Sequence, residues 1–192
     1  MVSTLERLHE SAHRAIPASL VGWSDTINDW CDAYCSQYSK AQLTEILLPP
    51  AAFVFDHTLE RVCFAYAISV PQLMKRDASR MRGFPNVNVS VRKALGEAAF
   101  AADRGHFLGH ASGGELDINL FPHRRDLNRG WSAEGKRFRQ MEAFVASHSG
   151  TFFYHGALYD DEMWIPAELE YGILREDGTW WIERFHNKTK PR

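Results

Sequence analysis

The first part of the chain has the apolar spacing of helices. Apolar residues recur at the three- and four-residue intervals of an amphipathic helix, at Trp23, Ile27, Trp30, Tyr34 and Tyr38. Ahead of them, residues 3–6 read STLE, the form of a capping box that starts a helix. We therefore expect two or three helices over residues 4–47, ending before Pro49-Pro50.

Two later regions have the pattern of β-strands. Residues 51–69 contain two apolar runs, rich in Phe and Val, around a polar turn at 57–60, which indicates a β-hairpin. Closer to the C-terminus, three more strands are predicted between acidic or glycine turns, over residues 151–161, 163–177 and 178–187.

The remaining apolar periodicity is helical. Residues 72–82 form a short basic stretch that follows Pro71 and stops at Gly83, as a helix would. Residues 134–148 predict a longer helix whose apolar face holds Phe138, Met141, Phe144 and Val145. Helices, hairpin, polar centre, helix and strands thus follow in blocks, which predicts an α+β fold with an antiparallel sheet.

Composition supports one substantial folded domain. The chain has 192 residues, of which 45% are hydrophobic and 12% aromatic, enough to form a core and unlike a disordered protein. We expect residues 1–50 to be a helical extension that packs on the same domain as residues 51–192.

The net charge of −2 conceals an uneven distribution along the chain. Residues 1–60 hold three Lys/Arg and eight Asp/Glu, and residues 143–183 hold one and eight. Residues 71–93 hold six and one, and residues 123–140 six and two, so basic segments flank a polar stretch. A polyanion would bind such a surface, although charge runs are equally typical of solvated helix faces.

Cysteine usage and hydropathy bear on the compartment. Cys31, Cys35 and Cys63 match neither a redox CxxC nor a zinc pattern, so we expect three buried thiols in a reducing environment. The N-terminus lacks the apolar core of a signal peptide, and no apolar run is long enough to span a membrane. These features predict a soluble protein that is cytoplasmic or delivered by a specialised secretion system.

The chemistry is concentrated in residues 103–131, DRGHFLGHASGGELDINLFPHRRDLNRGW. His106 could take a proton from water near neutral pH, although most histidines are simply surface or hydrogen-bonded residues. Asn128 offers an amide oxygen, a ligand type that suits Mg²⁺ or Ca²⁺, and its alternative role is a helix N-cap. Asn119 is expected to stabilise the turn after Gly113-Gly114 through bonds from its side chain to the backbone.

Other chemistries fit this stretch less well. The spacing of His106, His110 and His123 lacks the glutamate of HExxH and any cysteine at zinc spacing. Ser112 lacks the GxSxG setting of a nucleophilic serine.

The order DRGH, a glycine-rich turn, NLFPHRRDLN, and then RG and Trp with a glutamate on the next helix resembles the DNA/RNA non-specific endonuclease family. These enzymes have the ββα-metal, or His-Me finger, fold. The resemblance covers about residues 100–145 and, loosely, the strands as far as residue 186. It implies that residues 51–192 are a ββα-metal nuclease domain, and nothing comparable marks residues 1–50.

The resemblance also implies roles for individual residues. His106 would be the general base, Asn128 the protein ligand of a single Mg²⁺, and Asn119 a supporting residue. Arg104 would contact phosphate, with Arg129 and Arg125 as further substrate contacts. Glu142 would hold a water molecule that coordinates the metal.

The chain departs from the family pattern in three places. Trp131 follows Asn128 one residue early, and residues 132–139 look like an insertion before the usual glutamate, so Glu134 competes with Glu142 for its role. His123 stands where the family commonly has glutamine.

The implied function is a Mg²⁺-dependent endonuclease that hydrolyses DNA and RNA with little sequence preference, with Mn²⁺ or Ca²⁺ as substitute metals. One alternative is a nucleic-acid-binding module that keeps the fold without catalysis. Another is a toxin or effector nuclease whose partner is an immunity or inhibitor protein. The chain could also pair with a second copy as a homodimer.

Overall fold

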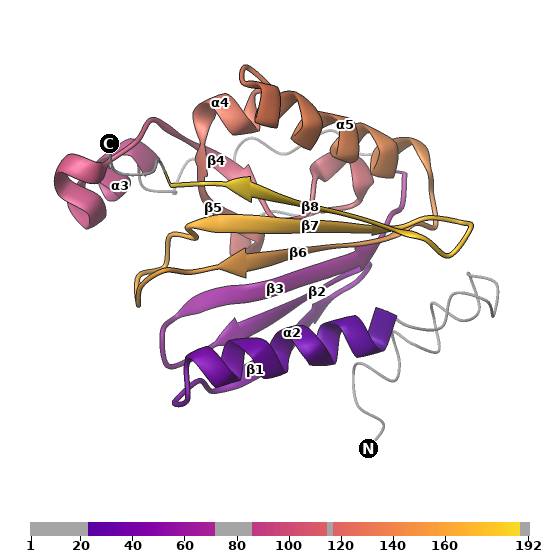
Figure 1. The fold of residues 1–192 in the computed structure, drawn as a ribbon, viewed down its shortest axis with the longest axis horizontal. Helices are drawn as coiled ribbons and strands as arrows, with labels where there is room; N and C mark the ends of the chain where they lie inside the picture. The colour runs from indigo at the N-terminus through magenta and orange to yellow at the C-terminus, as the bar shows by residue number, and fades with distance from the viewer. Residues whose placement is uncertain (1–22, 72–85, 115–116, 189–192) are drawn as a thin grey trace.

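The computed structural model describes residues 23–71, 86–114 and 117–188. Its main layer is a six-stranded antiparallel sheet in the order β1-β2-β3-β6-β7-β8 (Figure 1). A second, two-stranded sheet pairs β4 with β5. The sheet strands are β1 (Leu43–Leu48), β2 (Ala51–Asp56), β3 (Arg61–Ile68), β6 (Phe152–Leu158), β7 (Glu168–Leu174) and β8 (Trp180–His186). The other elements are α2 (Trp23–Gln37), α3 (Val87–Leu95), β4 (Ala102–His106), β5 (Leu120–Arg124), α4 (Arg125–Asn128) and α5 (Ala133–Ser147).

Two helices cover the two faces of the large sheet. Trp30 of α2 packs on Phe64 and Tyr154, and its indole N–H donates to the Cys63 carbonyl at 3.1 Å. Phe138 of α5 packs on His155, the neighbour of Tyr154, whose side chain therefore points to the opposite face. Strands covered on both faces are buried along nearly their whole length, as β3 and β6 are.

A glycine lets α2 approach the sheet closely. A Cβ atom on Gly156 would lie 2.1 Å from the Trp30 ring, too close for any other residue without movement of the helix. The aromatic face of α2 is thus seated directly on β3 and β6.

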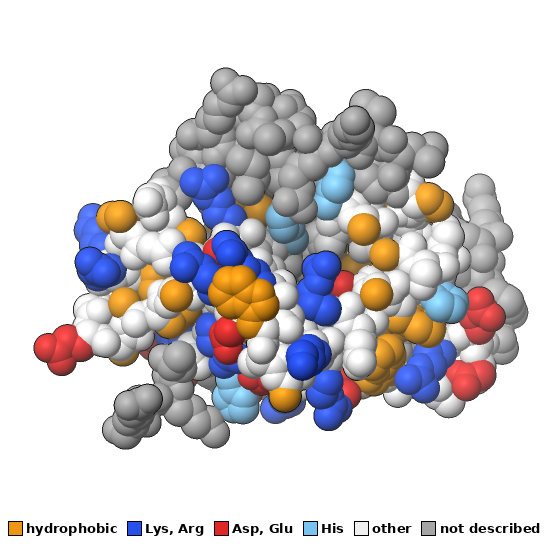
Figure 2. All heavy atoms as spheres, turned by 90° about the horizontal axis from the view of Figure 1, so that it is seen from above, with side chains coloured by type: hydrophobic (Ala, Val, Ile, Leu, Met, Phe, Trp, Pro, Cys, Tyr) orange, Lys and Arg blue, Asp and Glu red, His pale blue; other side chains and the backbone are white. Residues whose placement is uncertain are grey.

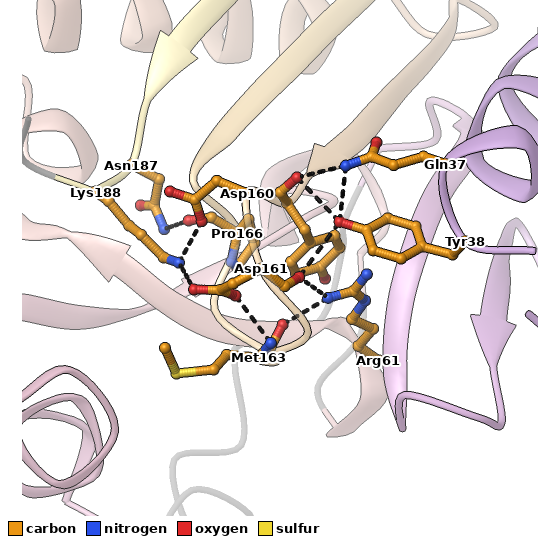
Figure 3. Close-up of polar contacts among 10 residues, drawn as sticks. Gln37, Tyr38, Arg61, Asp160, Asp161, Met163, Pro166, Asn187 and Lys188 are labelled. Atoms are coloured by element: carbon orange, nitrogen blue, oxygen red, sulfur yellow. Dashed lines mark hydrogen bonds and ion pairs between the residues drawn. The ribbon is translucent and has the colours of Figure 1, made fainter.

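Polar side chains fasten the C-terminal end of the chain to the rest of the molecule (Figure 3). The guanidinium of Arg61 donates to the carbonyls of Asp161 and Met163 at 2.8 Å, and Lys188 forms ion pairs with Asp160 and Asp161. These contacts fix the connection between β6 and β7 and the segment after β8.

Asn187 links the small sheet to the large one. Its side-chain amide donates to the carbonyls of Pro122 and Pro166, and its Oδ1 accepts the backbone N–H of Arg124 at 2.8 Å. Pro122 and Arg124 belong to β5, so this buried amide holds β5 against the end of β8.

Most of the predicted elements are confirmed. The hairpin over 51–69 is β2 and β3, the helix over 134–148 is α5, and the three C-terminal strands are β6, β7 and β8. The α+β class with an antiparallel sheet is also confirmed.

The expectation that helices continue to residue 47 is wrong. Helix α2 ends at Gln37, and residues 43–48 form β1, paired with β2 from Leu43↔Asp56 to Leu48↔Ala51. The apolar residues at the end of this segment belong to the edge strand of the sheet and not to the apolar face of a helix. The division at residue 50 therefore falls inside a hairpin. Residues 4–22 and the predicted basic helix at 72–82 lie outside the described residues.

The cysteines are not all buried as expected. Cys63 is buried and Cys31 half-buried, but Cys35 is exposed. Helix α2 packs through Ile27, Trp30 and Tyr34, and Cys35 lies about 100° further round the helix than Tyr34. Burial, chiefly, raises the pKa of the Cys31 thiol to about 11, which keeps it protonated and unreactive. Among the described residues, no helix is long and apolar enough to cross a membrane.

Candidate active site

Two strands and a short helix carry the polar residues identified in the sequence. β4 pairs antiparallel with β5, with Asp103 opposite His123 and His106 opposite Leu120. Helix α4 follows β5 directly and ends at Asn128. The ββα unit that the resemblance implied is therefore present, with His106 at the end of its first strand and Asn128 at the end of its helix.

Asp103 binds polar side chains of α4 and of its C-cap residue. Its carboxylate accepts hydrogen bonds from Arg125 Nε at 3.0 Å, from Arg129 Nε at 2.5 Å and Nη2 at 3.1 Å, and from Asn128 Nδ2 at 3.5 Å. Burial acts to raise the pKa of Asp103, but the hydrogen bonds from Arg129, Arg125 and Asn128 outweigh it and lower the pKa. The carboxylate is consequently ionised at neutral pH.

This contact orients the Asn128 amide. An ionised carboxylate can only accept hydrogen bonds, so the amide turns its NH₂ group toward Asp103 and its oxygen Oδ1 away. Asn128 is also the last residue of α4, and the N-cap of α5 is Ser132, whose Oγ accepts the Gly135 N–H at 2.9 Å. The N-cap interpretation of Asn128 is therefore wrong, and its Oδ1 has the chemistry of a hard-metal ligand.

His123 of β5 lies opposite Asp103 and packs against the backbone of β4. It is fully buried, and burial, chiefly, lowers its pKa to about 3; the positive charge of Arg124 acts in the same direction. The negative charge of Asp103 opposes this shift. The Asn128 side chain reaches Asp103 on β4, the strand that His106 ends, so the two candidates belong to one ββα unit.

Gly105 allows His123 this position. A Cβ atom at Gly105 would lie 2.3 Å from the Cβ of His123 on the paired strand. The imidazole thus packs on the backbone directly before His106. A neutral, buried ring fixes this part of β4 without adding charge to the site.

Asn119 clamps the loop that follows His106. Its Oδ1 accepts the Leu108 N–H and its Nδ2 donates to the Leu108 carbonyl, each at 2.8 Å, while its own carbonyl accepts the Phe107 N–H at 3.0 Å. The side chain is fully buried. As expected it bonds to the backbone, but it holds Leu108 rather than the turn at Gly113-Gly114. It lies in the interior and supports the strand end that carries His106.

The two candidate glutamates have different surroundings. Glu134 Oε2 accepts Arg124 Nη2 at 2.6 Å, and Oε1 accepts the backbone N–H of His186 at 2.7 Å and its Nδ1 at 3.1 Å. Both of its oxygens therefore fasten α5 to β5 and β8.

Glu142 lies next to the loop that follows β4. Its Oε1 is 3.6 Å from the position of a Cβ atom built on Gly109, and its Oε2 accepts Arg139 Nη1 at 2.7 Å. Of the two glutamates, only Glu142 lies next to Gly109, in the loop that follows His106.

The three predicted phosphate contacts do not converge. Arg104 is half-buried beside a small cavity of about 40 Å³ that Val87 and Trp164 also line, and it points to the same face of β4 as His106, two residues on. Arg125 and Arg129 instead bind Asp103. Arg129 nevertheless keeps 48% of its side chain exposed.

Within the described residues, no group of three or more His, Cys, Asp or Glu is arranged to hold a metal ion. A magnesium site needs no such group, because Mg²⁺ keeps several waters and binds through one or two protein oxygens. Asn128 Oδ1, turned away from Asp103, fits that requirement.

Comparison with known proteins gives limited similarity. No protein family and no curated protein matches the sequence. Among solved structures, the chain is similar to one described as the EndoG/EndoGI complex, with a TM-score of 0.45 and 14% identity over 76% of this chain and 74% of that one. It is also similar to an extracellular endonuclease (TM-score 0.42, 14% identity, 79% and 81% covered) and to an extracellular nuclease (0.41, 13%, 79% and 90%).

Proposed function

We propose that the protein is a divalent-metal-dependent endonuclease that hydrolyses phosphodiester bonds of DNA and RNA. One observation carries the proposal: a single ββα unit carries His106 at the end of β4 and Asn128 at the end of α4, and the Asn128 side chain reaches Asp103 of β4. A proton acceptor and a hard oxygen ligand on one ββα unit are what hydrolysis of a phosphodiester requires.

In this proposal His106 takes the proton of the attacking water. Asn119 and His123 act as positioning residues for it, Asn119 by clamping Leu108 and His123 by packing on Gly105. A general base must be held within hydrogen-bonding reach of the proton that it removes. Two buried contacts at the end of β4 serve that purpose.

Asn128 Oδ1 would hold the metal, with Asp103 orienting the amide. A bound Mg²⁺ supplies Lewis-acid stabilisation of the charge that develops on phosphoryl and leaving oxygens. Glu142, beside the loop after β4, is the glutamate that we assign to the water around the metal, because Glu134 is engaged by Arg124 and His186.

Arg104 is the arginine that we assign to the scissile phosphate, because it shares a face of β4 with His106. Arg129 and Arg125 would contribute positive potential from their places on Asp103. Contacts of this kind read the backbone and not the bases, which predicts weak sequence preference and action on both DNA and RNA.

The proposal is tested by incubating supercoiled plasmid and total RNA with the wild-type chain in Mg²⁺, Mn²⁺, Ca²⁺ or EDTA. We expect cleavage of both substrates with Mg²⁺ and none with EDTA. Asn128→Ala should lose the metal-dependent cleavage while keeping the wild-type melting temperature. A folded wild-type chain that binds nucleic acid but cleaves neither substrate with any of the metals would instead be the inactive binding module.

A further inference from the structure

Trp131 is exposed where a soluble protein would normally bury such a side chain. It lies in the turn between α4 and α5, and 64% of it is exposed. On the face that carries these helices, an exposed hydrophobic side chain stands among Lys and Arg side chains (Figure 2). A large exposed aromatic residue in a basic surface is typical of sites that bind single-stranded nucleic acid.

The indole of Trp131 lines an open cavity of about 430 Å³. The other walls are the short segment before β4 and the start of α4: Ala99, Phe100, Ala101, Arg124, Arg125 and Asp126. Its volume is within the range of small-molecule sites, about 300–1,000 Å³. The guanidinium of Arg129 lies over the indole, 4.9 Å from the ring centroid.

The turn fixes the backbone of Trp131. Its backbone N–H donates to the Asp126 carbonyl at 2.8 Å, and Gly130 adopts a left-handed backbone with φ of 71°. Gly135 brings α5 against α4, since a Cβ atom there would lie 2.5 Å from the Asp126 carbonyl oxygen. A ring on a fixed backbone loses little conformational freedom on binding a ligand.

Charge alone does not explain what the cavity would bind. Arg124 forms ion pairs with Asp126 and Glu134, and Arg125 and Arg129 share Asp103. Three arginines are therefore offset by three carboxylates. What distinguishes this surface is planar stacking area, offered by the indole and the guanidinium groups around it.

The cavity is linked to the proposed metal ligand through Arg125 and Asp103. Arg125 lines it and also donates to Asp103, and the same carboxylate accepts the hydrogen bond from Asn128. A ligand in the cavity would contact Arg125, which binds Asp103, and Asp103 orients the Asn128 amide.

From these observations we propose that Trp131 stacks on an unpaired base of the substrate strand, next to the cleaved phosphodiester, and so favours single-stranded DNA and RNA over duplex. This inference rests on the proposed nuclease function for its substrate, although stacking can be measured without cleavage. A base in a duplex is already stacked and paired, so its use here would first require that it be extruded.

The test compares the wild type with Trp131→Ala and, as a matched control, Ile182→Ala, an exposed hydrophobic on the far side of the molecule. The probes are a thymidine oligonucleotide and the same oligonucleotide with one abasic position, each labelled with a dye, and the readout is the fluorescence anisotropy of the dye in EDTA. We expect Trp131→Ala to bind the intact oligonucleotide about 5- to 150-fold more weakly, as loss of one stacked base does. Ile182→Ala should bind like the wild type, and Trp131→Phe should fall between the two.

The abasic probe adds a second criterion. If Trp131 stacks on a base, moving the abasic position along the strand should find one at which the wild type binds as weakly as Trp131→Ala. Equal binding of the intact probe by wild type and Trp131→Ala would overturn the inference, as would equal loss of duplex and single-strand binding.

Cleavage separates this inference from the proposed function. With Mg²⁺, we expect Trp131→Ala to lose more of its cleavage rate on single strands at low concentration than on supercoiled plasmid. If the wild type cuts nothing, the nuclease proposal fails, while the binding result still decides whether Trp131 stacks on a base.

Discussion

Two buried histidines should make the folded state sensitive to mild acid. Burial, chiefly, lowers the pKa of both His123 and His155 from 6.5 to about 3. His155 lies between the rings of Phe138 and Tyr171, with centroid distances of 5.6 Å and 3.9 Å, and neither of its ring nitrogens has a hydrogen-bond partner among the described residues. Each imidazole is therefore neutral in the folded protein and protonated below pH 6.5 once unfolded.

The sign and size of the effect follow from this difference in pKa. The unfolded chain binds more protons than the folded one between pH 6.5 and about pH 3, so stability is retained above this window and is lost as the pH falls through it. One pKa unit corresponds to about 1.4 kcal/mol, so lowering the pH from 7 to 5 should cost about 2 kcal/mol for each histidine and about 4 kcal/mol for both. This is a large part of the ~5–15 kcal/mol that stabilises an ordinary domain.

The perturbation that isolates one histidine is His155→Phe. Phenylalanine fills the same aromatic surroundings and removes two buried nitrogens, so we expect stability at pH 7 to be equal to the wild type or higher. The loss between pH 7 and pH 5 should fall by half, to about 2 kcal/mol. Urea unfolding followed by far-ultraviolet circular dichroism at the two pH values measures both quantities. An unchanged pH dependence in His155→Phe would refute the reasoning, because it would mean that His155 is not neutral and buried.

Three further substitutions test individual contacts of the site. Asp103→Asn removes the charge that holds the α4 arginines and orients the Asn128 amide, so the Mg²⁺ concentration for half-maximal cleavage should rise about 10- to 100-fold, and an unchanged metal dependence would contradict that role. Gly105→Ala places a Cβ atom 2.3 Å from His123, so thermal unfolding should show that the free energy of unfolding falls by about 1–3 kcal/mol. Wild-type stability in this variant would mean that β4 and β5 can move apart at this position without cost. Glu134→Gln should lower the melting temperature yet leave the metal dependence of cleavage unchanged; the opposite pattern would favour Glu134 over Glu142 near the metal.

The apolar pattern predicted the strands that are continuous Phe- and Val-rich runs and the helix whose apolar residues recur three and four apart. The hairpin β2–β3 and helix α5 were predictable because Phe and Val runs, or apolar residues three and four apart, leave one folded arrangement. Strand β1 was not, since LTEILL at 43–48 is a short apolar run that fits a buried helix and a strand equally well. Its pairing with β2 decides between them, and pairing depends on the rest of the sheet.

The candidate site could be predicted as a set of residues but not as a set of contacts. The motif identified His106, Asn128 and Arg104 by their chemistry and spacing. Asp103 was missed as the residue that gathers α4, because its role depends on α4 packing beside β4, which no local pattern encodes. Asn187 was missed for the same reason, as it lies more than sixty residues from the strand that it holds. The signal available was only that Asp103 is an acid in the polar stretch between two basic segments.

The central claim is that His106 removes the proton of the attacking water. The most direct test is the maximal rate of plasmid cleavage at saturating Mg²⁺ by His106→Ala, with His148→Ala, an exposed histidine at the end of α5, as the control. The account predicts a loss of at least ~10²-fold for His106→Ala at an unchanged melting temperature, and no loss for the control. A His106→Ala variant that cleaves at the wild-type rate would contradict the account.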